Sequence, residues 1–246
     1  MRWAVAGWRI VRGILHVLHG SAVIATRFPS LDAAGRNERV MWWSRAFLRL
    51  LDISITSHGA PHAGRKLLVA NHVSWLDILA INAVLPAHFV SKSEVKRWPL
   101  VGRLVSGAGT LYIERARPRD AMRVVHKMAE ALAAGDTVAI FPEGTTSEGH
   151  TLLPFHANLL QAAVATASPV QPVLLRYSDP ARKVSPAVTF VGETTMLRSI
   201  GMVATARGLS VHVELLDAEP PAPLDRRELA ARLHGRMSER LAELVA

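Results

Sequence analysis

The chain has 246 residues, and 50% of them are apolar, which excludes a disordered or collagen-like protein. Its 29 Lys and Arg against 20 Asp and Glu give a formal net charge of +9, which favours anionic partners such as acidic lipid headgroups or acidic carrier proteins. Cysteine is absent, so disulfides, thiolate zinc sites and a covalent thiol mechanism are excluded.

Residues 1–60 predict two amphipathic helices that lie along a membrane surface. On a helix over Trp3–Ala25, the side chains of Arg9, Arg12 and His16 share one stripe, and apolar side chains cover most of the rest. A second helix over Glu38–Asp52 repeats this arrangement, and Trp residues in both segments favour the boundary between headgroups and hydrocarbon. The pattern indicates an interfacial anchor. Two alternatives are helices that cap a soluble core and a cleavable signal peptide.

Residues 61–246 predict one α/β domain with a mostly parallel central sheet covered by helices, because short apolar runs alternate with segments of helical periodicity. The expected strands are Lys66–Ala70, His88–Ser91, Thr110–Ile113, Thr137–Phe141, Val170–Arg176, Val188–Val191 and Ser210–Leu215. The expected helices are Ser74–Leu85, Pro118–Ala134, Phe155–Ala167 and Asp225–Val245.

Polar clusters follow three of the expected strands directly. They are Asn71–Asp77, Glu114–Arg115 and Pro142–Ser147. If the strands are parallel, all three clusters lie at the same carboxyl edge of the sheet, which is where open α/β sheets bind their ligands. The order of strands and clusters therefore predicts a ligand site at this edge.

The first cluster contains a His and an Asp five residues apart. His72 and Asp77 would lie roughly 140° apart on one helix, but they can meet if His72 precedes the helix and Ser74 caps it. A carboxylate in the first turn could then hold one nitrogen of the imidazole and leave the other free as a general base, without a separate nucleophile. The alternative is a purely structural His at a strand end.

The other two clusters offer groups that could bind an anion. Arg115 presents a bidentate fork to phosphate or carboxylate, although it could instead pair with the neighbouring Glu114. Glu143 and Gly144 form a turn that could bring backbone amides and one carboxylate to a ligand, or could be an ordinary connection after a strand.

Four segments in this order resemble the motifs of the glycerolipid acyltransferases, typified by bacterial 1-acyl-sn-glycerol-3-phosphate acyltransferases. They are Asn71–Asp77, Gly109–Arg115, Phe141–Ser147 and, more weakly, Val170–Val173. The resemblance implies transfer of an acyl chain from acyl carrier protein or coenzyme A to the hydroxyl of a lysolipid, with phosphatidic acid from 1-acyl-sn-glycerol-3-phosphate as the first candidate product. Neither a further cofactor nor a metal is implied, and the enzyme would lie on the cytoplasmic face of the cell inner membrane.

The resemblance also implies roles for individual residues. His72 would deprotonate the attacking hydroxyl, and Asp77 would orient it. The residues that would bind the acceptor are Lys92, Arg115, Glu143, Gly144, Thr145 and Thr146.

One position departs from the family pattern, because the third motif usually carries Arg where this chain has Thr146. A hydroxyl cannot replace a bidentate phosphate ligand, and this form of the motif is similar to that of the lyso-ornithine lipid acyltransferases. Lyso-ornithine lipid is therefore the alternative acceptor. An alternative of another class is a non-catalytic monotopic membrane-binding protein. No motif for a serine hydrolase, a nucleotide, a metal or a nucleic acid is evident.

Overall fold

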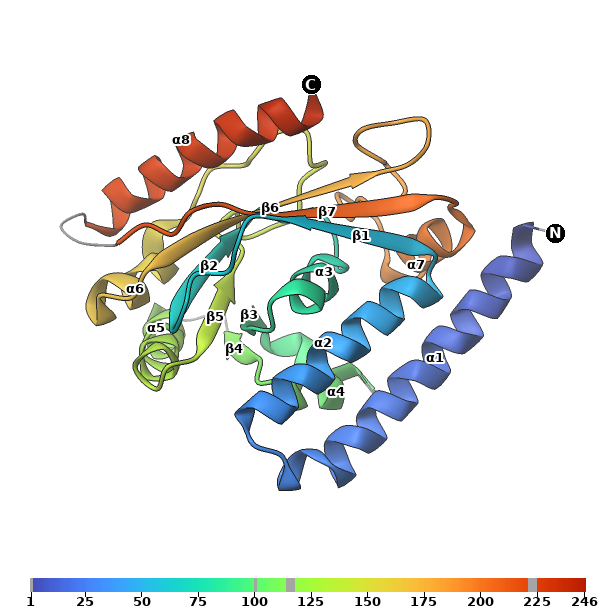
Figure 1. Ribbon diagram of the computed structural model, residues 1–246, viewed down its shortest axis with the longest axis horizontal. Coiled ribbons are helices and arrows are strands. Elements are labelled where there is room, and N and C mark those ends of the chain that lie inside the picture. The colour runs from blue at the N-terminus through green and yellow to red at the C-terminus, as the bar shows by residue number, and fades with distance from the viewer. Residues whose placement is uncertain (1, 100, 114–117, 221–224) are drawn as a thin grey trace.

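The computed structural model describes residues 2–99, 101–113, 118–220 and 225–246, and within them a seven-stranded sheet is sandwiched between helices (Figure 1). The strand order is β1-β7-β6-β2-β5-β3-β4. The strands are β1 (Ile53–His58), β2 (Lys66–Ala70), β3 (His88–Lys92), β4 (Leu111–Ile113), β5 (Thr137–Ile140), β6 (Val170–Ser178) and β7 (Leu209–Leu215).

Five neighbouring strands, from β6 to β4, run parallel, while β7 is antiparallel to β6 and parallel to β1. The carboxyl ends of β2, β5, β3 and β4 therefore lie at one edge, as the positions of the polar clusters require. This confirms the mostly parallel α/β fold expected from the alternating pattern. The central β2 is buried over all five residues, which is typical of a strand covered on both faces.

Each face of the sheet has its own apolar core. On one face lie α2 (Ala33–Leu50), α3 (Asp77–Val84) and α7 (Met196–Thr205), with Leu48, Ile81 and Val203 buried between them. On the other face lie α5 (Pro118–Ala133), α6 (Gln161–Thr166) and α8 (Arg226–Val245), which bury side chains such as Met128 and Leu233. Outside α2, α1 (Arg2–Thr26) contacts α2, α7 and α4 (Val101–Gly107). Short 3₁₀ turns complete the fold, namely η1 (Phe28–Ser30), η2 (Ser93–Arg97) and η3 (Ala157–Leu160).

The sheet begins earlier than the sequence indicated. β1 pairs with β7 over six residues, although it lies inside residues 1–60, which were expected to hold only the amphipathic helices. The boundary between helices and sheet therefore falls at Asp52, whose left-handed φ of 61° turns the chain from α2 into β1. The short helices α4 and α7 were also not anticipated.

The strand expected at Val188–Val191 is wrong. This apolar run lies over the loop between β2 and α3, where the Phe190 N–H donates to the Val73 carbonyl instead of joining a ladder. Val188 is fully buried there, so the segment has the apolar pattern of a strand without its pairing. The helix expected over Phe155–Ala167 is also shorter, because η3 and α6 occupy only Ala157–Thr166.

Two side chains of the polar stripe of α1, Arg9 and His16, face the protein, while Arg12 is exposed. Arg9 is only 12% exposed, and its guanidinium donates to the carbonyls of Ala204 and Ala206 at the end of α7 and to the Asp52 carboxylate. His16 is half-buried, and its Nε2 lies 3.0 Å from the carbonyl oxygen of Trp43 on α2. Polar contacts and close packing thus dock α1 on the domain.

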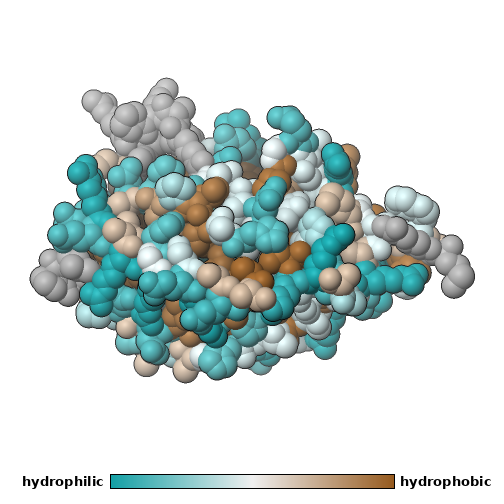
Figure 2. Space-filling view, turned by 90° about the horizontal axis from the view of Figure 1, so that it is seen from above, coloured by the Kyte–Doolittle hydropathy of each residue, from teal (hydrophilic) through white to brown (hydrophobic). Residues whose placement is uncertain are grey.

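The apolar side of α1 consequently faces outward. Its exposed side chains include Trp3, Trp8 and Leu15, which are 77%, 60% and 58% exposed. Among the described residues, no helix is both long and apolar enough to cross a membrane. Figure 2 looks instead onto the face over α8, where hydrophilic side chains predominate around smaller apolar areas.

Candidate active site

The site begins where β2 leaves the sheet. Ala70 is the last residue of β2 in register with β6, and Asn71 follows it with no exposed surface. The Asn71 side chain accepts a hydrogen bond from the Leu175 N–H at 2.7 Å and donates one to the Leu175 carbonyl at 3.0 Å. This pair of bonds fixes the end of the strand immediately before His72.

His72 and Asp77 meet as the spacing required. The imidazole Nδ1 lies 2.7 Å from the Asp77 carboxylate, with His72 in the loop before α3 and Asp77 in the first turn of that helix. Because a carboxylate only accepts, Nδ1 carries a proton in this contact, and in the neutral imidazole the lone pair is on Nε2. The His72 side chain is 22% exposed, while Asp77 has no exposed surface.

Asp77 rather than Ser74 organises the start of α3. The Asp77 Oδ2 that holds His72 also accepts from the backbone N–H groups of Val73 and Ser74, at 2.7 and 2.9 Å. The Ser74 hydroxyl is buried and has no hydrogen-bond partner among the described residues, so the expectation that it caps the helix is wrong. The Asp77 carboxylate thus holds the imidazole and also accepts the backbone N–H groups at the start of the helix.

Tyr177 on β6 is a member of the site that sequence reasoning missed. Its hydroxyl donates to the other oxygen of Asp77 at 2.8 Å, and the side chain is 2% exposed. Burial, together with the adjacent Asp77 charge, raises the pKa of the Tyr177 hydroxyl well above its ordinary value, so it remains a donor. A Tyr directly after the expected strand Val170–Arg176 was the available signal, because a buried hydroxyl requires a partner.

The imidazole ring of His72 is held against an aromatic face. Its centroid lies 4.0 Å from that of Phe141, and the two planes differ by 13°. Phe141 directly follows β5, which neighbours β2, so parallel pairing brings the two rings together. Asp77 holds one edge of the imidazole and Phe141 covers one face, so the ring cannot turn freely. Nε2 is then the nitrogen available as a base.

Glu143 acts inside the protein. It is 3% exposed, and its two oxygens accept from the N–H groups of His72 and Leu153, at 2.8 and 2.9 Å. Burial raises the pKa of the Glu143 carboxyl, while the two N–H donors oppose that effect. This carboxylate joins the loop of the base to the segment after β5, so its contacts favour a bracing role over the direct acceptor contact expected from the sequence.

The next residues form a loop around the base. Gly144 has a φ of +69°, which favours glycine, and Thr145 is exposed. The Thr146 hydroxyl donates to the Phe190 carbonyl, and the Ser147 N–H donates to the His72 carbonyl at 2.7 Å. Thr145 and Gly144 thus remain at the accessible side of the loop, whereas Thr146 bonds to the segment that crosses it.

The two basic candidates lie at the end of β3 and after β4. Lys92 is exposed and stands in register with Ile113, the last residue of β4. Arg115 and Glu114 follow β4 and lie outside the described residues. No group of three His, Asp or Glu side chains in the described part of the chain could hold a metal ion. Among the described residues, the arrangement offers one imidazole base oriented by a buried carboxylate.

The sequence profile of the Acyltransferase family matches residues 53–176, which run from β1 into β6 and include His72, Asp77, Phe141 and Glu143. The chain belongs to this family. The acyltransferase is 37% identical to a lyso-ornithine lipid O-acyltransferase of Pseudomonas aeruginosa, over 83% of this chain and 79% of the relative. It is 39% identical to a 1-acyl-sn-glycerol-3-phosphate acyltransferase of Neisseria meningitidis, over 74% of this chain and 71% of the relative.

A crystal structure has the same fold over nearly the whole acyltransferase. The 1-acyl-sn-glycerophosphate (LPA) acyltransferase PlsC of Thermotoga maritima superposes with a TM-score of 0.69 at 20% identity, covering 97% of this chain and 98% of that one. The α/β fold and the N-terminal helices are thus shared. The protein is an enzyme that transfers acyl groups, as its motifs indicated.

Proposed function

We propose that this acyltransferase moves a fatty acyl chain from a thioester to the free hydroxyl of a lysolipid, with His72 as general base. The observation that carries the proposal is the Nδ1 contact of His72 with a fully buried Asp77, because it orients the ring and leaves Nε2 as the nitrogen that can accept a proton. The donor would be acyl carrier protein or coenzyme A. No further cofactor takes part.

In this reaction the lysolipid hydroxyl gives its proton to Nε2 while its oxygen attacks the thioester carbon. The tetrahedral intermediate collapses as the carbon–sulfur bond breaks, and the imidazolium returns the proton to the departing sulfur. The negative charge of Asp77 stabilises the imidazolium that exists between these steps. No acyl-enzyme forms, which agrees with a chain that has no cysteine.

An apolar pocket beside the base supports an acyl substrate. It holds about 100 Å³ and lies among α1, α2, α3, β3 and α4, with Val23, Trp43, Leu79, Phe89 and Leu104 in its lining. Phe89 stacks on Phe141 at 5.8 Å, and Phe141 stacks on His72, so aromatic rings lead from the pocket to the base. Such a lining suits hydrocarbon rather than a polar group.

The decisive experiment compares His72→Ala with the intact enzyme in an assay with radiolabelled acyl thioester and lysolipid. We expect kcat to fall by about 10² to 10⁴-fold, because the hydroxyl loses its proton acceptor. His126→Ala is the matched control, since its side chain is 75% exposed on α5 and lies apart from the site. Full activity of His72→Ala with an unchanged circular dichroism spectrum would refute the base assignment.

Two acceptors are candidates for this site. The motifs resemble those of enzymes for 1-acyl-sn-glycerol-3-phosphate, and in that case the product is phosphatidic acid for phospholipid biosynthesis. Lys92 and Arg115 would supply positive charge for the phosphate. The second candidate is lyso-ornithine lipid, favoured by Thr146, because its hydroxyl is engaged with Phe190 and no Arg is present there to hold a phosphate. Competition between the two lysolipids in one assay decides between them.

We also propose that the enzyme is peripheral or monotopic on the cytoplasmic face of the cell inner membrane, held by the outward apolar side of α1. Replacing Trp8 and Leu15 together by Ser should weaken binding to anionic vesicles by 10-fold or more, at roughly 1.5–3 kcal/mol for each large apolar side chain. Met122→Ser is the control, because Met122 is 75% exposed on another helix. Unchanged sedimentation of the double variant with vesicles would contradict this orientation.

A further inference from the structure

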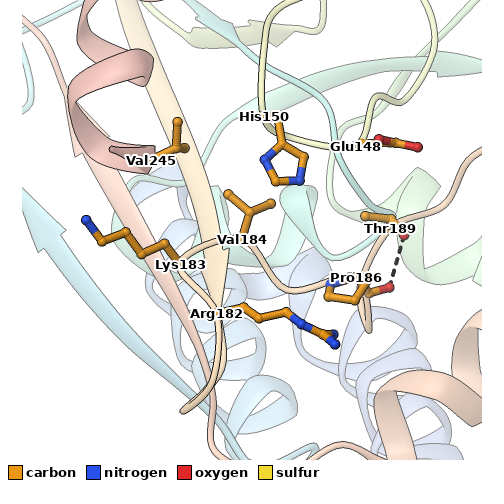
Figure 3. Close-up of a pocket in the computed structure, with 8 residues that line it drawn as sticks. All are labelled: Glu148, His150, Arg182, Lys183, Val184, Pro186, Thr189 and Val245. Atoms are coloured by element: carbon orange, nitrogen blue, oxygen red, sulfur yellow. Dashed lines mark hydrogen bonds between the residues drawn. The ribbon is translucent and has the colours of Figure 1, made fainter.

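A polar pocket of about 540 Å³ lies beyond the catalytic loop, and the function proposed so far does not use it (Figure 3). Three segments contribute to it: residues 148–150 after the third motif, residues 182–189 after β6, and the end of α8. Its lining consists of Glu148, His150, Arg182, Lys183, Val184, Pro186, Thr189 and Val245. The pocket therefore combines charges of both signs with a few apolar side chains.

Both main walls of the pocket begin one residue from a contact with the catalytic loop. Glu148 follows Ser147, whose N–H donates to the His72 carbonyl at 2.7 Å. Thr189 precedes Phe190, whose N–H donates to the Val73 carbonyl at 3.1 Å. Both walls of the pocket are thus joined through main-chain hydrogen bonds to the loop that carries His72.

Thr146 joins these two walls. Its hydroxyl donates to the Phe190 carbonyl, and thereby ties the third-motif loop to the segment that carries Arg182 and Thr189. The residue that departs from the family pattern thus helps to build the pocket. The single replacement of Arg by Thr146 would therefore both change the acceptor headgroup and help to form this pocket.

The charged ends in the pocket are free to meet a ligand. No hydrogen bond or ion pair within the described part of the chain engages the carboxylate of Glu148 or the guanidinium of Arg182. In Figure 3 these two side chains reach toward the same side of the pocket, with Pro186 and Thr189 between them, while Lys183 points to the opposite side. Such a separated anion and cation match a ligand that carries one ammonium and one carboxylate.

The pocket also lies on the side that a headgroup would occupy. Its described lining includes Val245 of α8 but nothing from α1, α2 or α4, whereas the apolar pocket beside His72 is lined by those helices. A lysolipid with its chain toward α1 and α2 and its hydroxyl at His72 would extend its headgroup away from the membrane-facing helix.

We infer that this pocket binds a zwitterionic amino-acid headgroup of the acceptor, with Glu148 facing the ammonium and Arg182 facing the carboxylate. The inference rests on the proposed lysolipid acylation and names its acceptor class, for which lyso-ornithine lipid is the probe. A phosphate headgroup lacks the ammonium, and its negative charge would be repelled by Glu148.

The test measures kcat and KM for lyso-ornithine lipid and for 1-acyl-sn-glycerol-3-phosphate with Glu148→Gln and Arg182→Gln. For lyso-ornithine lipid we expect each variant to raise KM about 10-fold or more with little change in kcat, because a charged hydrogen bond is lost from binding. For the phosphate acceptor, Glu148→Gln should leave KM unchanged or lower it. Glu193→Gln and Arg198→Gln are matched controls, since both are exposed in the same region outside the pocket.

The outcomes separate the two proposals. An intact enzyme inactive on both acceptors would refute lysolipid acylation itself. An active enzyme whose KM for lyso-ornithine lipid does not respond to Glu148→Gln would overturn only the headgroup site. Equal losses for both acceptors, or a raised KM for the thioester donor, would likewise overturn it and indicate a distorted loop or a donor site.

Discussion

The first and last helices of the chain, α1 and α8, are both long and amphipathic, yet they dock through opposite kinds of surface. α8 buries its apolar stripe, including Leu229, Leu233 and Met237, against one face of the sheet. α1 turns its apolar stripe outward and docks through Arg9, His16 and small residues. Helical periodicity reveals that a helix has two faces, but the partners available to the polar face decide which one is buried.

Glycine spacing makes the docking of α1 possible. Gly13 and Gly20 face α2, and a Cβ on Gly20 would come within 2.5 Å of Trp43 Nε1 and 2.7 Å of a Leu104 methyl carbon. The Trp43 indole in turn donates to the His16 carbonyl at 3.1 Å. The close approach brings α1 onto α2 while Trp3, Trp8 and Leu15 stay exposed, where the proposed membrane contact would use them.

The largest contrast should appear when one leucine is truncated in each helix. Leu233→Ala in α8 removes a fully buried side chain, and we expect it to lower the free energy of unfolding by about 2–5 kcal/mol. Leu15→Ala in α1 should change it by only about 0.5 kcal/mol in either direction, because the side chain is 58% exposed. Urea denaturation in mild detergent measures both. Equal losses would mean that the outward face of α1 is buried in the enzyme.

A smaller effect is expected from adding one methyl group to α1. Gly20→Ala should cost about 1–3 kcal/mol in the docking of α1, because the new Cβ meets Trp43 and Leu104. Gly7→Ala is the matched control, with no atom within 4 Å of the added carbon, and should stabilise the helix by about 0.5–1 kcal/mol. Protease protection of residues 1–26 reports docking. If Gly20→Ala were protected as well as Gly7→Ala, close packing of α1 on α2 would be disproved.

The smallest effect is a pH dependence of the same docking. Burial lowers the pKa of His16, with a further lowering by His19, while the contact with the Trp43 carbonyl opposes both. The folded state therefore binds this proton more weakly than the unfolded chain. Neutral His16 therefore stabilises the docking of α1 fully above its ordinary pKa of 6.5. This stabilisation is lost as the pH falls through the lower pKa of His16 in the folded protein. Indole fluorescence of α1 and α2 follows this, and His16→Gln should flatten the curve; an identical curve would exclude His16 as its source.

Much of the fold follows from local patterns. β2, β5 and α8 begin and end close to the expected residues, because each has a strong apolar period and clear end signals. β1 was missed because it is an edge strand with mostly exposed or half-exposed side chains, and only its pairing with β7 makes it part of the sheet. The segment Val188–Val191 was wrongly expected to be a strand, because it is a loop whose apolar residues, such as Val188, are buried as they would be in a strand.

The site was predictable where residues act through neighbours in sequence and not where partners are distant. His72 and Asp77 meet as expected, because five residues of one loop determine their approach. Tyr177 is 100 residues from Asp77, and the adjacency of β2 and β6 that joins them cannot be read from spacing. Glu143 likewise faces inward because a distant main chain, that of His72, offers it an N–H group.

Asn71 shows how a side chain can imitate a peptide bond. Its amide carries the same donor and acceptor as the main chain, so it supplies Leu175 with the partner that β2 would otherwise provide by continuing. The strand can therefore leave the ladder at this point without orphaning either buried group of β6. Asp would lack the donor, Leu would lack both groups, and Gln would reach one methylene too far. The narrow choice at this position is thus imposed by the architecture of the sheet, independently of the role proposed for His72.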